Sequence, residues 1–390
     1  MKPPRPPARI GTALPAPADV ISADLLDGWL LHTAALRSGA ACSLLPGQVL
    51  MLPGRGSGGA EASFAHGVAN TAGVSTVTAL EDRRIRRELL KSYEIPAPES
   101  AAFSVRRGYE AALAYAESAG WPVRLKPVVG EAGIEVISDV RGPEEFAAAF
   151  EYFQTAPTRR SNFTSSSYSF TQIFMPRGRT GLAKPGYEVM VEPQIPGTKL
   201  RMLTVDGEVV SALHRGGGET RYTDVLAEID SSVVDLARRV AGLFPDLLCV
   251  SLEVLVANPA QPLDAQQHQV LEVSERPWLH VQYQVSAQTA ERIAGRILRA
   301  VDSTAGEATH PIDVDFHWEG LADAEHELPV LQRAAAAAQV HCSAEIGDDL
   351  GGSLRGRLRG SADAIALLTE LAVAGRLLED PVMWAETTPR

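Results

Sequence analysis

The stretch from Tyr187 to Pro277 constrains this chain more than any other, because its pattern predicts an antiparallel sheet with charged residues on separate strands. It opens with E-V-M-V-E-P-Q-I-P-G-T-K-L-R-M-L-T-V-D-G-E-V-V-S-A-L-H-R and closes with V-S-L-E-V-L-V and V-L-E-V-S-E-R-P. The closing strands carry Glu253 and Glu272, and neighbouring strands carry cations. Carboxylate oxygens bind Mg²⁺ and cations bind phosphate oxygens, so the pattern predicts a site for a magnesium nucleotide. We expect the two carboxylates to face one another across adjacent strands, within reach of one ion.

Composition narrows the class of protein. The 390 residues suffice for two or three domains, and a hydrophobic fraction of 45% is ordinary for a soluble globular chain. The formal net charge of −12 argues against a broad surface for nucleic acid or an anionic membrane, and we expect neither as a partner. Cys42, Cys249 and Cys342 lack His or Cys at metal-binding spacing, so we expect reduced thiols and a cytoplasmic protein. No signal peptide or membrane-spanning run is expected.

The first part of the chain alternates helical and strand patterns. Helices are predicted over residues 21–36, 61–72, 81–92, 109–119 and 141–153, and strands over 48–54, 100–105, 121–127 and 134–139. The glycine-rich run from Gly54 to Gly59 lacks the Lys-Ser/Thr of a P-loop, and a flexible loop is the better interpretation. The arginine-rich helix over 81–92 leaves two interpretations open. Its arginines form a solvated face, or one or two of them reach a nucleotide phosphate.

The rest of the chain contains an insert and a distinct C-terminal pattern. Residues 154–186 break the pattern, and we expect a mobile lid, an insert that contacts a partner, or plain disorder. Helices are expected over residues 230–242 and 289–301. From Pro311 onwards a β-α-β-β-α-β order predicts a ferredoxin-like module, an arrangement that hosts many functions.

Together these pieces resemble the ATP-grasp superfamily of carboxylate–amine ligases over about Ala62 to Tyr283. Among its members the pattern is most similar to D-alanine–D-alanine ligase, the ligase domain of cyanophycin synthetase and bifunctional glutathione synthetase. E-I-P-A-P stands for the family's G-I-P-x-P, and P-V-R-L-K-P, followed by a glycine loop, stands for P-V-x-x-K-P. The segment from Glu192 to Arg201 matches E-x-x-I-x-G-x-x-x-R, and E-V-S-E-R-P stands for E-x-N-x-x-P. The order and spacing of these motifs carry the resemblance, since each alone is weak.

The resemblance implies ATP as a cofactor and assigns residues to it. Lys126 would contact the nucleotide phosphates, and the loop of Gly130, Glu131 and Gly133 would cover them. Glu192 would accept a hydrogen bond from the adenine amino group. The backbone of Ile195 would meet the adenine ring.

The resemblance also implies Mg²⁺ and a catalytic pair. Glu253 and Glu272 would bind the ion, with Ser274 as a third oxygen ligand. Arg201 and Arg215 would hold the transferred phosphoryl group or the substrate carboxylate, to which the guanidinium fork is suited.

Three of these positions depart from the family pattern. Arg83 stands where a lysine is usual, and Ser274 stands where an asparagine is usual. Lys199 stands in the nucleotide site where an acid normally accepts hydrogen bonds from the ribose, which a lysine cannot do.

The fold class expected from the resemblance is α+β, with two lobes around a nucleotide cleft. The domains would be an N-terminal domain over 1–80, an ATP-grasp domain over 81–305 with the insert, and the ferredoxin-like module over 306–390. The expected activity joins a carboxylate to an amine through an acylphosphate. The expected substrates are amino acids or peptides in secondary metabolism, and a homodimer is one expected assembly. The alternatives are a kinase that phosphorylates a hydroxyl and a non-catalytic relative that binds a partner. His214 and His280 flank the expected site, and a structural role is the simpler interpretation of both.

Overall fold

The computed structural model describes residue 21 and residues 23–53, 60–130, 135–155, 188–216, 221–302, 311–347 and 352–390. The chain divides into two compact units, one formed by residues 1–71 and 276–390 and the other by residues 72–275. The glycine-rich loop 54–59, the insert beyond residue 155, and the predicted site residues Glu131 and Gly133 lie outside the described residues. Within the described ranges, no helix combines the length and apolarity that crossing a membrane requires.

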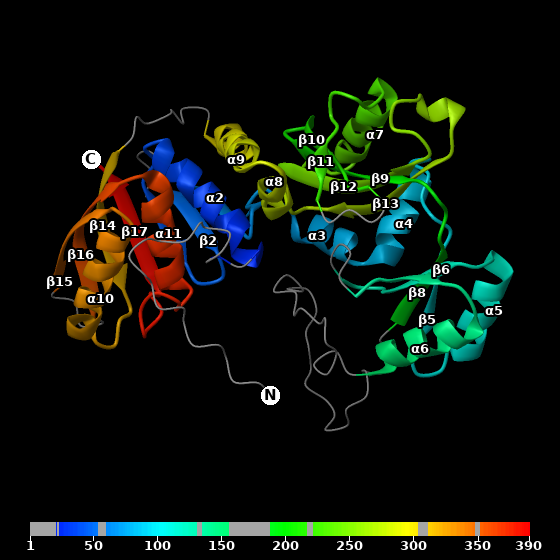
Figure 1. Cartoon of the computed structure of the whole chain (residues 1–390), viewed down its shortest axis with the longest axis horizontal. Coiled ribbons are helices and arrows are strands. Elements are labelled where there is room, and N and C mark those ends of the chain that lie inside the picture. The colour runs from blue at the N-terminus through cyan, green and yellow to red at the C-terminus, as the bar shows by residue number, and fades with distance from the viewer. Residues whose placement is uncertain are drawn as a thin grey trace. The chain divides into compact units, whose positions relative to one another are not determined.

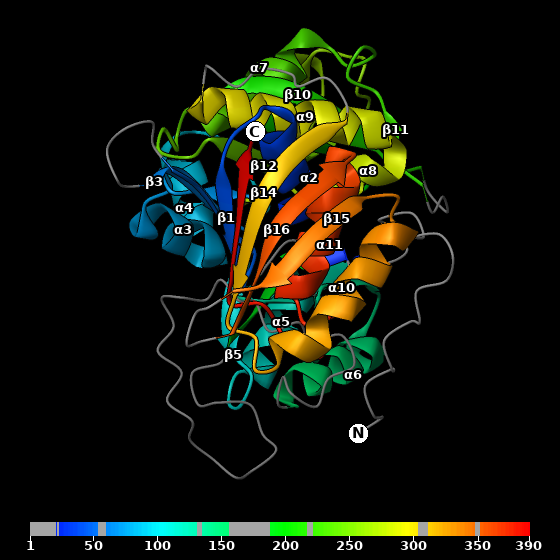
Figure 2. The ribbon, with the colours of Figure 1, turned by 90° about the vertical axis from the view of Figure 1, so that its left-hand side faces the viewer.

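The first unit, made from both parts of the chain that flank the second, is built on one antiparallel eight-stranded sheet of order β15-β16-β14-β17-β1-β2-β3-β4 (Figures 1 and 2). Its strands are β1 (Cys42–Leu45), β2 (Val49–Pro53), β3 (Ala60–Ala65), β4 (Val68–Ala69), β14 (Ile312–Glu319), β15 (His341–Ile346), β16 (Ser353–Gly360) and β17 (Trp384–Pro389).

Helices cover this sheet, as Figure 2 shows for α2 (Ala23–Arg37), α10 (Ala324–Ala337) and α11 (Ala362–Val373). Helices α8 (Leu279–Val285) and α9 (Ala287–Val301) pack against α2. Burial alternates along β14, where Val314 and Trp318 are buried and Asp313 and Asp315 are not. This alternation is typical of an antiparallel sheet with one face on the core and the other in water.

The second unit contains two antiparallel sheets. The four-stranded sheet has the order β5-β8-β6-β7 and the five-stranded sheet has the order β11-β10-β9-β12-β13. The strands are β5 (Ala101–Ser104), β6 (Val123–Pro127), β7 (Ile137–Val140), β8 (Glu188–Pro193), β9 (Thr198–Val205), β10 (Glu208–His214), β11 (Thr223–Asp224), β12 (Cys249–Val256) and β13 (His268–Ser274). Helices α5 (Tyr109–Ala119) and α6 (Pro143–Gln154) pack on the smaller sheet.

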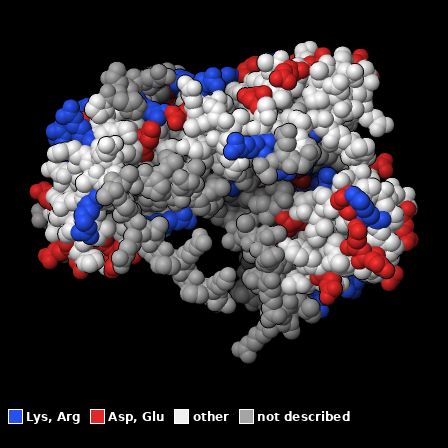
Figure 3. All heavy atoms as spheres, in the orientation of Figure 1, with Lys and Arg blue, Asp and Glu red and all other residues white. Residues whose placement is uncertain are grey.

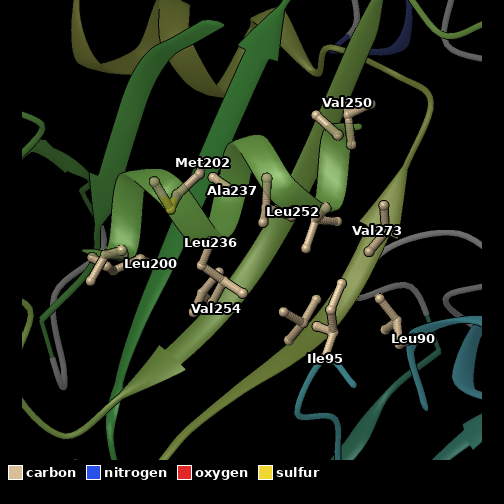
Figure 4. Packing of buried hydrophobic residues seen from close by; sticks show 14 of the residues in the cluster. Leu90, Ile95, Leu200, Met202, Leu236, Ala237, Val250, Leu252, Val254 and Val273 are labelled. Atoms are coloured by element: carbon tan, nitrogen blue, oxygen red, sulfur yellow. The ribbon is translucent and has the colours of Figure 1, made fainter. Parts of the chain in front are cut away.

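The larger sheet buries one face under helix α7 (Ser231–Ala241), as Figure 4 shows. Leu236 and Ala237 of this helix belong to the same buried cluster as Met202, Leu252 and Val254 of the strands. Leu90 and Ile95 continue the cluster beside Val273, and they bring helix α4 (Arg83–Ser92) to the edge strand β13. The face of the sheet that points away from α7 is therefore left for the charged residues of β9, β12 and β13.

The C-terminal element order is confirmed, whereas its separation into a domain is not what the structure shows. Residues 311–390 form β14, α10, β15, β16, α11 and β17 in the predicted order. Strand β1 pairs with β17, however, with Cys42 opposite Thr387, so the parts predicted as domains 1–80 and 306–390 share one sheet. A strand edge exposes unpaired backbone groups, and β1 satisfies that edge of β17. Helices α8 and α9, whose residues fall within the predicted domain 81–305, belong to this unit as well.

One predicted helix is wrong, and another is wrong in part. Residues 61–72 form the hairpin β3–β4 instead of a helix, because His66 and Gly67 both adopt positive φ and close a tight turn. The predicted helix over 81–92 is two helices, α3 (Val74–Glu81) and α4, separated by Asp82 in an extended conformation.

Candidate functional site

The break at Asp82 places the start of α4 against the end of β6. The Asp82 carboxylate caps α4 by accepting from the Arg84 N–H at 2.9 Å. The Arg83 N–H donates to the Val128 carbonyl at 2.9 Å, and Asp82 forms a β-bridge with Val129. Backbone hydrogen bonds thus join the helix to the four-stranded sheet.

Helix α4 buries three arginines, so the solvated-face interpretation is wrong for them. Arg83, Arg86 and Arg87 are 0%, 3% and 7% exposed, whereas Ile85 is 43% exposed. Positions three and four residues apart lie on one side of a helix, which puts these three side chains together. Arg86 donates to the Val273 carbonyl at 3.1 Å, and Arg87 donates to the carbonyls of Val270 and Leu271 at 2.9 Å each. These bonds attach the helix to β13.

Glu272 of β13 receives cations on both carboxylate oxygens. Its Oε1 accepts from Arg83 Nε at 3.2 Å and from Lys126 Nζ at 3.1 Å, and its Oε2 accepts from Arg86 Nη2. Burial by itself would raise the pKa of Glu272, but the surrounding cations outweigh burial and hold that pKa well below its usual value. The carboxylate is therefore ionised, and both of its oxygens accept hydrogen bonds from cations.

Glu192 of β8 is the second buried carboxylate that receives cations on both oxygens. It is 0% exposed, and cations contact both of its oxygens: Lys126 Nζ at 2.9 Å, Arg87 Nη2 at 3.1 Å and Arg124 Nη1 at 3.3 Å. Burial would raise the pKa of Glu192, and the cations, Lys126 foremost, lower it instead. Lys126 thus bridges the two carboxylates, although burial lowers the pKa of its ammonium. We name Arg83, Arg86, Arg87, Arg124, Lys126, Glu192 and Glu272 the α4 cluster.

A smaller and more open group lies on the five-stranded sheet. Glu253 of β12 contacts Lys199 Nζ at 3.4 Å and Arg201 Nη1 at 3.9 Å. The side chains of Glu253 and Arg201 are each 14% exposed, and that of Lys199 is 49% exposed. Lys199 therefore pairs with a carboxylate at the surface of this group.

The register predicted for the two carboxylates is found, but the arrangement does not fit an ion shared between them. Glu253 and Glu272 are direct partners across β12 and β13, so their side chains leave the same face of the sheet. The α4 cluster already occupies both oxygens of Glu272. Among the described residues, no group of three or more His, Cys, Asp or Glu side chains is placed to hold a metal ion.

The remaining predicted residues are spread more widely. Gly130 lies beside the α4 cluster, where an added Cβ would approach Arg83 Nη1 to 3.2 Å. Ile195 is half-buried after β8, and Ser274 pairs with Ser251 at the end of β13. Arg215 follows β10, with its guanidinium 5.5 Å from the centre of the Tyr222 ring.

The two flanking histidines belong to different units. His214 ends β10 in the second unit, opposite Leu200 of β9. His280 belongs to the first unit, where its N–H donates to Asp27 at 3.1 Å.

Sequence reasoning missed Arg124 and did not single out Arg86 and Arg87 from the arginine run. Arg124 lies two residues before Lys126, and alternate residues of a strand share a face, so the strand pattern contained a signal for it. The spacing of positions 83, 86 and 87 contained a signal for one helical side. Neither pattern tells which side is buried.

The helices that pack on the four-stranded sheet carry the opposite charge on their exposed side. Figure 3 shows acidic side chains gathered over α5 and α6. Exposed members of this group are Glu110, Glu117, Glu144, Glu145 and Glu151. The acidic surface and the buried cations account for how a chain of net charge −12 contains a concentrated positive site.

No protein-family model and no curated protein matches the chain, whereas solved structures do. One is D-alanine–D-alanine ligase from Bacillus anthracis, at 16% identity and a TM-score of 0.39, over 59% of this chain and 68% of that chain. Another is the ATP-grasp ligase PsnB, at 16% identity and a TM-score of 0.38, over 59% of this chain and 60% of PsnB. A third is a bifunctional glutathione synthetase from Pasteurella multocida, at 14% identity and a TM-score of 0.45, over 71% of this chain and 43% of the synthetase. The match thus spans less than two thirds of PsnB and less than half of the synthetase, and the chain resembles ATP-grasp ligases of solved structure.

Proposed function

We propose that residues 72–275 form the nucleotide-binding and catalytic unit of an ATP-dependent carboxylate–amine ligase. One observation carries the proposal: buried Lys126 bridges Glu192 and Glu272 where the two sheets meet. Three cations contact Glu272 and three contact Glu192, and Lys126 is common to both sets, so five cations contact two carboxylates. A polyphosphate supplies the anionic oxygens that such a group of guanidinium and ammonium donors binds.

In the proposed reaction, a substrate carboxylate oxygen attacks the γ-phosphorus of ATP and ADP leaves, giving an acylphosphate. An amine then attacks the acyl carbon and phosphate leaves, giving an amide. The cations of the α4 cluster bind the phosphates, and Arg201 and Arg215 hold the transferred phosphoryl group or the substrate carboxylate. Such chemistry needs positioning and charge stabilisation more than acid–base catalysis.

The proposed cofactors are ATP and Mg²⁺, and the proposed substrates are amino acids or short peptides in secondary metabolism. When bound, Mg²⁺ would neutralise charge on the β- and γ-phosphates. Glu253, whose cation contacts are longer than those of Glu272, is the carboxylate available to it. None of the three cysteines forms a disulfide, which supports a cytoplasmic location.

A second candidate, a non-catalytic protein of the same fold, is favoured by one observation. Every carboxylate proposed for the nucleotide site, Glu192, Glu253 and Glu272, already contacts cations of the chain itself. In a non-catalytic protein these contacts between carboxylates and cations would stabilise the fold, and no reaction is needed to account for them.

Release of ADP separates the candidates. The full chain is incubated with ATP, Mg²⁺ and pools of amino acids and short peptides, and amine-dependent ADP release is expected. Lys126→Met should abolish that release, whereas Lys91→Met, the same change at an exposed position of α4, should not. Release with a hydroxyl acceptor alone would indicate a kinase. Nucleotide binding without release in any pool would favour the non-catalytic candidate, and absence of nucleotide binding would refute both the ligase and the kinase.

A further inference from the structure

The two facing carboxylates Glu253 and Glu272 differ in what they can still bind. Glu272 accepts from three cationic groups, and its residue is 7% exposed. A guanidinium cannot give up its proton at neutral pH, so Arg83 and Arg86 cannot make room by becoming neutral. A divalent cation at Glu272 would lie next to three positive charges in a buried site, where repulsion is poorly screened.

Glu253 has the opposite properties. Its contacts to Lys199 and Arg201, at 3.4 and 3.9 Å, are longer than ordinary charge-assisted hydrogen bonds. The Lys199 side chain is 49% exposed and can move into water at little cost. The carboxylate oxygens of Glu253 are therefore held less tightly than those of Glu272.

We propose that Glu272 is a positioning residue that holds the cations of the α4 cluster and does not bind the divalent cation of the proposed function. Arg86 then occupies at Glu272 the place that a shared ion would take. Two further N–H groups of this cluster, Arg86 Nε and Arg87 Nε, are buried without a hydrogen-bond partner. The proposal extends the proposed function, because the ion would arrive with the nucleotide.

The positioning role is tested without nucleotide, by a double-mutant cycle of Arg86→Met and Glu272→Gln on the stability of the full chain. Glu272→Gln leaves buried cations without a carboxylate, so the melting temperature of the 72–275 transition should fall by on the order of 10 °C. The double variant should lose clearly less than the sum of the single changes. Arg84→Met is the matched control, because this α4 side chain is 48% exposed and should shift the transition by only about 2 °C. Additive effects would overturn the positioning role.

Whether Glu272 binds the divalent cation is tested with Mn²⁺ as a paramagnetic probe, titrated in the presence of a saturating non-hydrolysable ATP analogue. Glu253→Gln should weaken Mn²⁺ binding by about tenfold or more, whereas Arg86→Met should strengthen it, because Oε2 of Glu272 then loses its cation. Glu272→Gln should change it by less than about threefold. Where that variant does not fold, Arg86→Met/Glu272→Gln takes its place in the measurement.

Equal losses for the Glu253 and Glu272 variants would show a shared ion and overturn the proposal. Absence of analogue binding by the unmodified chain would instead refute the proposed function. The stability cycle would then decide the positioning role, since it needs no nucleotide.

Discussion

At the scale of single residues, Lys126 combines complete burial with contacts to two carboxylates from different sheets. Lys126→Met should weaken binding of ATP by ~1.5–3 kcal/mol, the range for a hydrogen bond to a charged group. Isothermal titration calorimetry measures this, with Lys91→Met as the exposed control. Unchanged affinity would show that the nucleotide does not bind at the α4 cluster.

A second residue-scale prediction concerns His32 in the first unit. Its imidazole is 1% exposed and lies 3.7 Å from Glu370 Oε1. Burial alone would lower the pKa of His32, but Cys42 and Glu370 outweigh burial and raise it to about 10. The folded pKa of His32 is above its unfolded value of about 6.5, so protonation of His32 stabilises the folded first unit. This stabilisation is complete below pH ~6.5 and is lost as the pH rises toward 10.

The melting temperature of the first unit should therefore fall between pH 7 and pH 10. In His32→Gln the decline over this window should be smaller, because the titrating group is gone. His341→Gln, a change at an exposed histidine, is the control. An identical decline in the His32 variant and the unmodified chain would contradict the assignment. Differential scanning calorimetry at several pH values measures it.

At the scale of elements, helix α4 shows why periodicity alone does not predict which side of a helix is buried. Leu90 of this helix is buried, but Ile85 is exposed and three arginines are buried, so hydrophobic spacing does not tell which side faces the core. Buried arginines are tolerated here because carboxylates and strand carbonyls of other elements accept their hydrogen bonds. Those acceptors lie 44, 183 and 189 positions away in sequence.

The β15–β16 pair provides a prediction at the same scale. Gly356 has a φ of +156°, and an added Cβ would lie 2.0 Å from the Ser343 carbonyl oxygen and 2.7 Å from Ala344 Cα. Gly356→Ala should therefore force the two strands apart and cost ~1–3 kcal/mol of stability. Gly142→Ala, where an added Cβ meets nothing within 4 Å, is the control. Chemical denaturation measures both, and equal stability of the two variants would contradict the steric argument.

At the scale of the whole molecule, one unit is continuous in sequence and the other is not. Residues 72–275 contain both sheets of the candidate site and their own hydrophobic clusters. Residues 276–390 need the segment before residue 72, because β1 pairs with β17 and α2 packs on α11.

Removal of residues 1–71 should therefore abolish the cooperative melting transition of the first unit and leave that of residues 72–275 in place. The isolated fragment 72–275 should fold and melt as a single transition, because its contacts are internal. Calorimetry of the two truncated chains measures this. A first unit that still melts cooperatively without residues 1–71 would show that the shared sheet is not needed for its folding.

Local sequence patterns were enough for the strands that carry the site and for the C-terminal element order. Side chains in strands alternate with a period of two, so the segments of Glu253 and Glu272 could be identified as strands, and the carboxylates were found as direct partners. The motif around Lys126 likewise predicts a strand, and Lys126 lies on β6.

Long-range contacts determined the rest, because local patterns do not record which distant groups meet. The hairpin β3–β4 depends on positive φ at His66 and Gly67, and an Ala-rich run gives no sign of it. The sharing of one sheet by both flanking parts of the chain depends on pairing between Cys42 and Thr387, which are 345 positions apart. The burial of Arg86 depends on Glu272, 186 positions away, because burying a guanidinium is costly unless a carboxylate pairs with it.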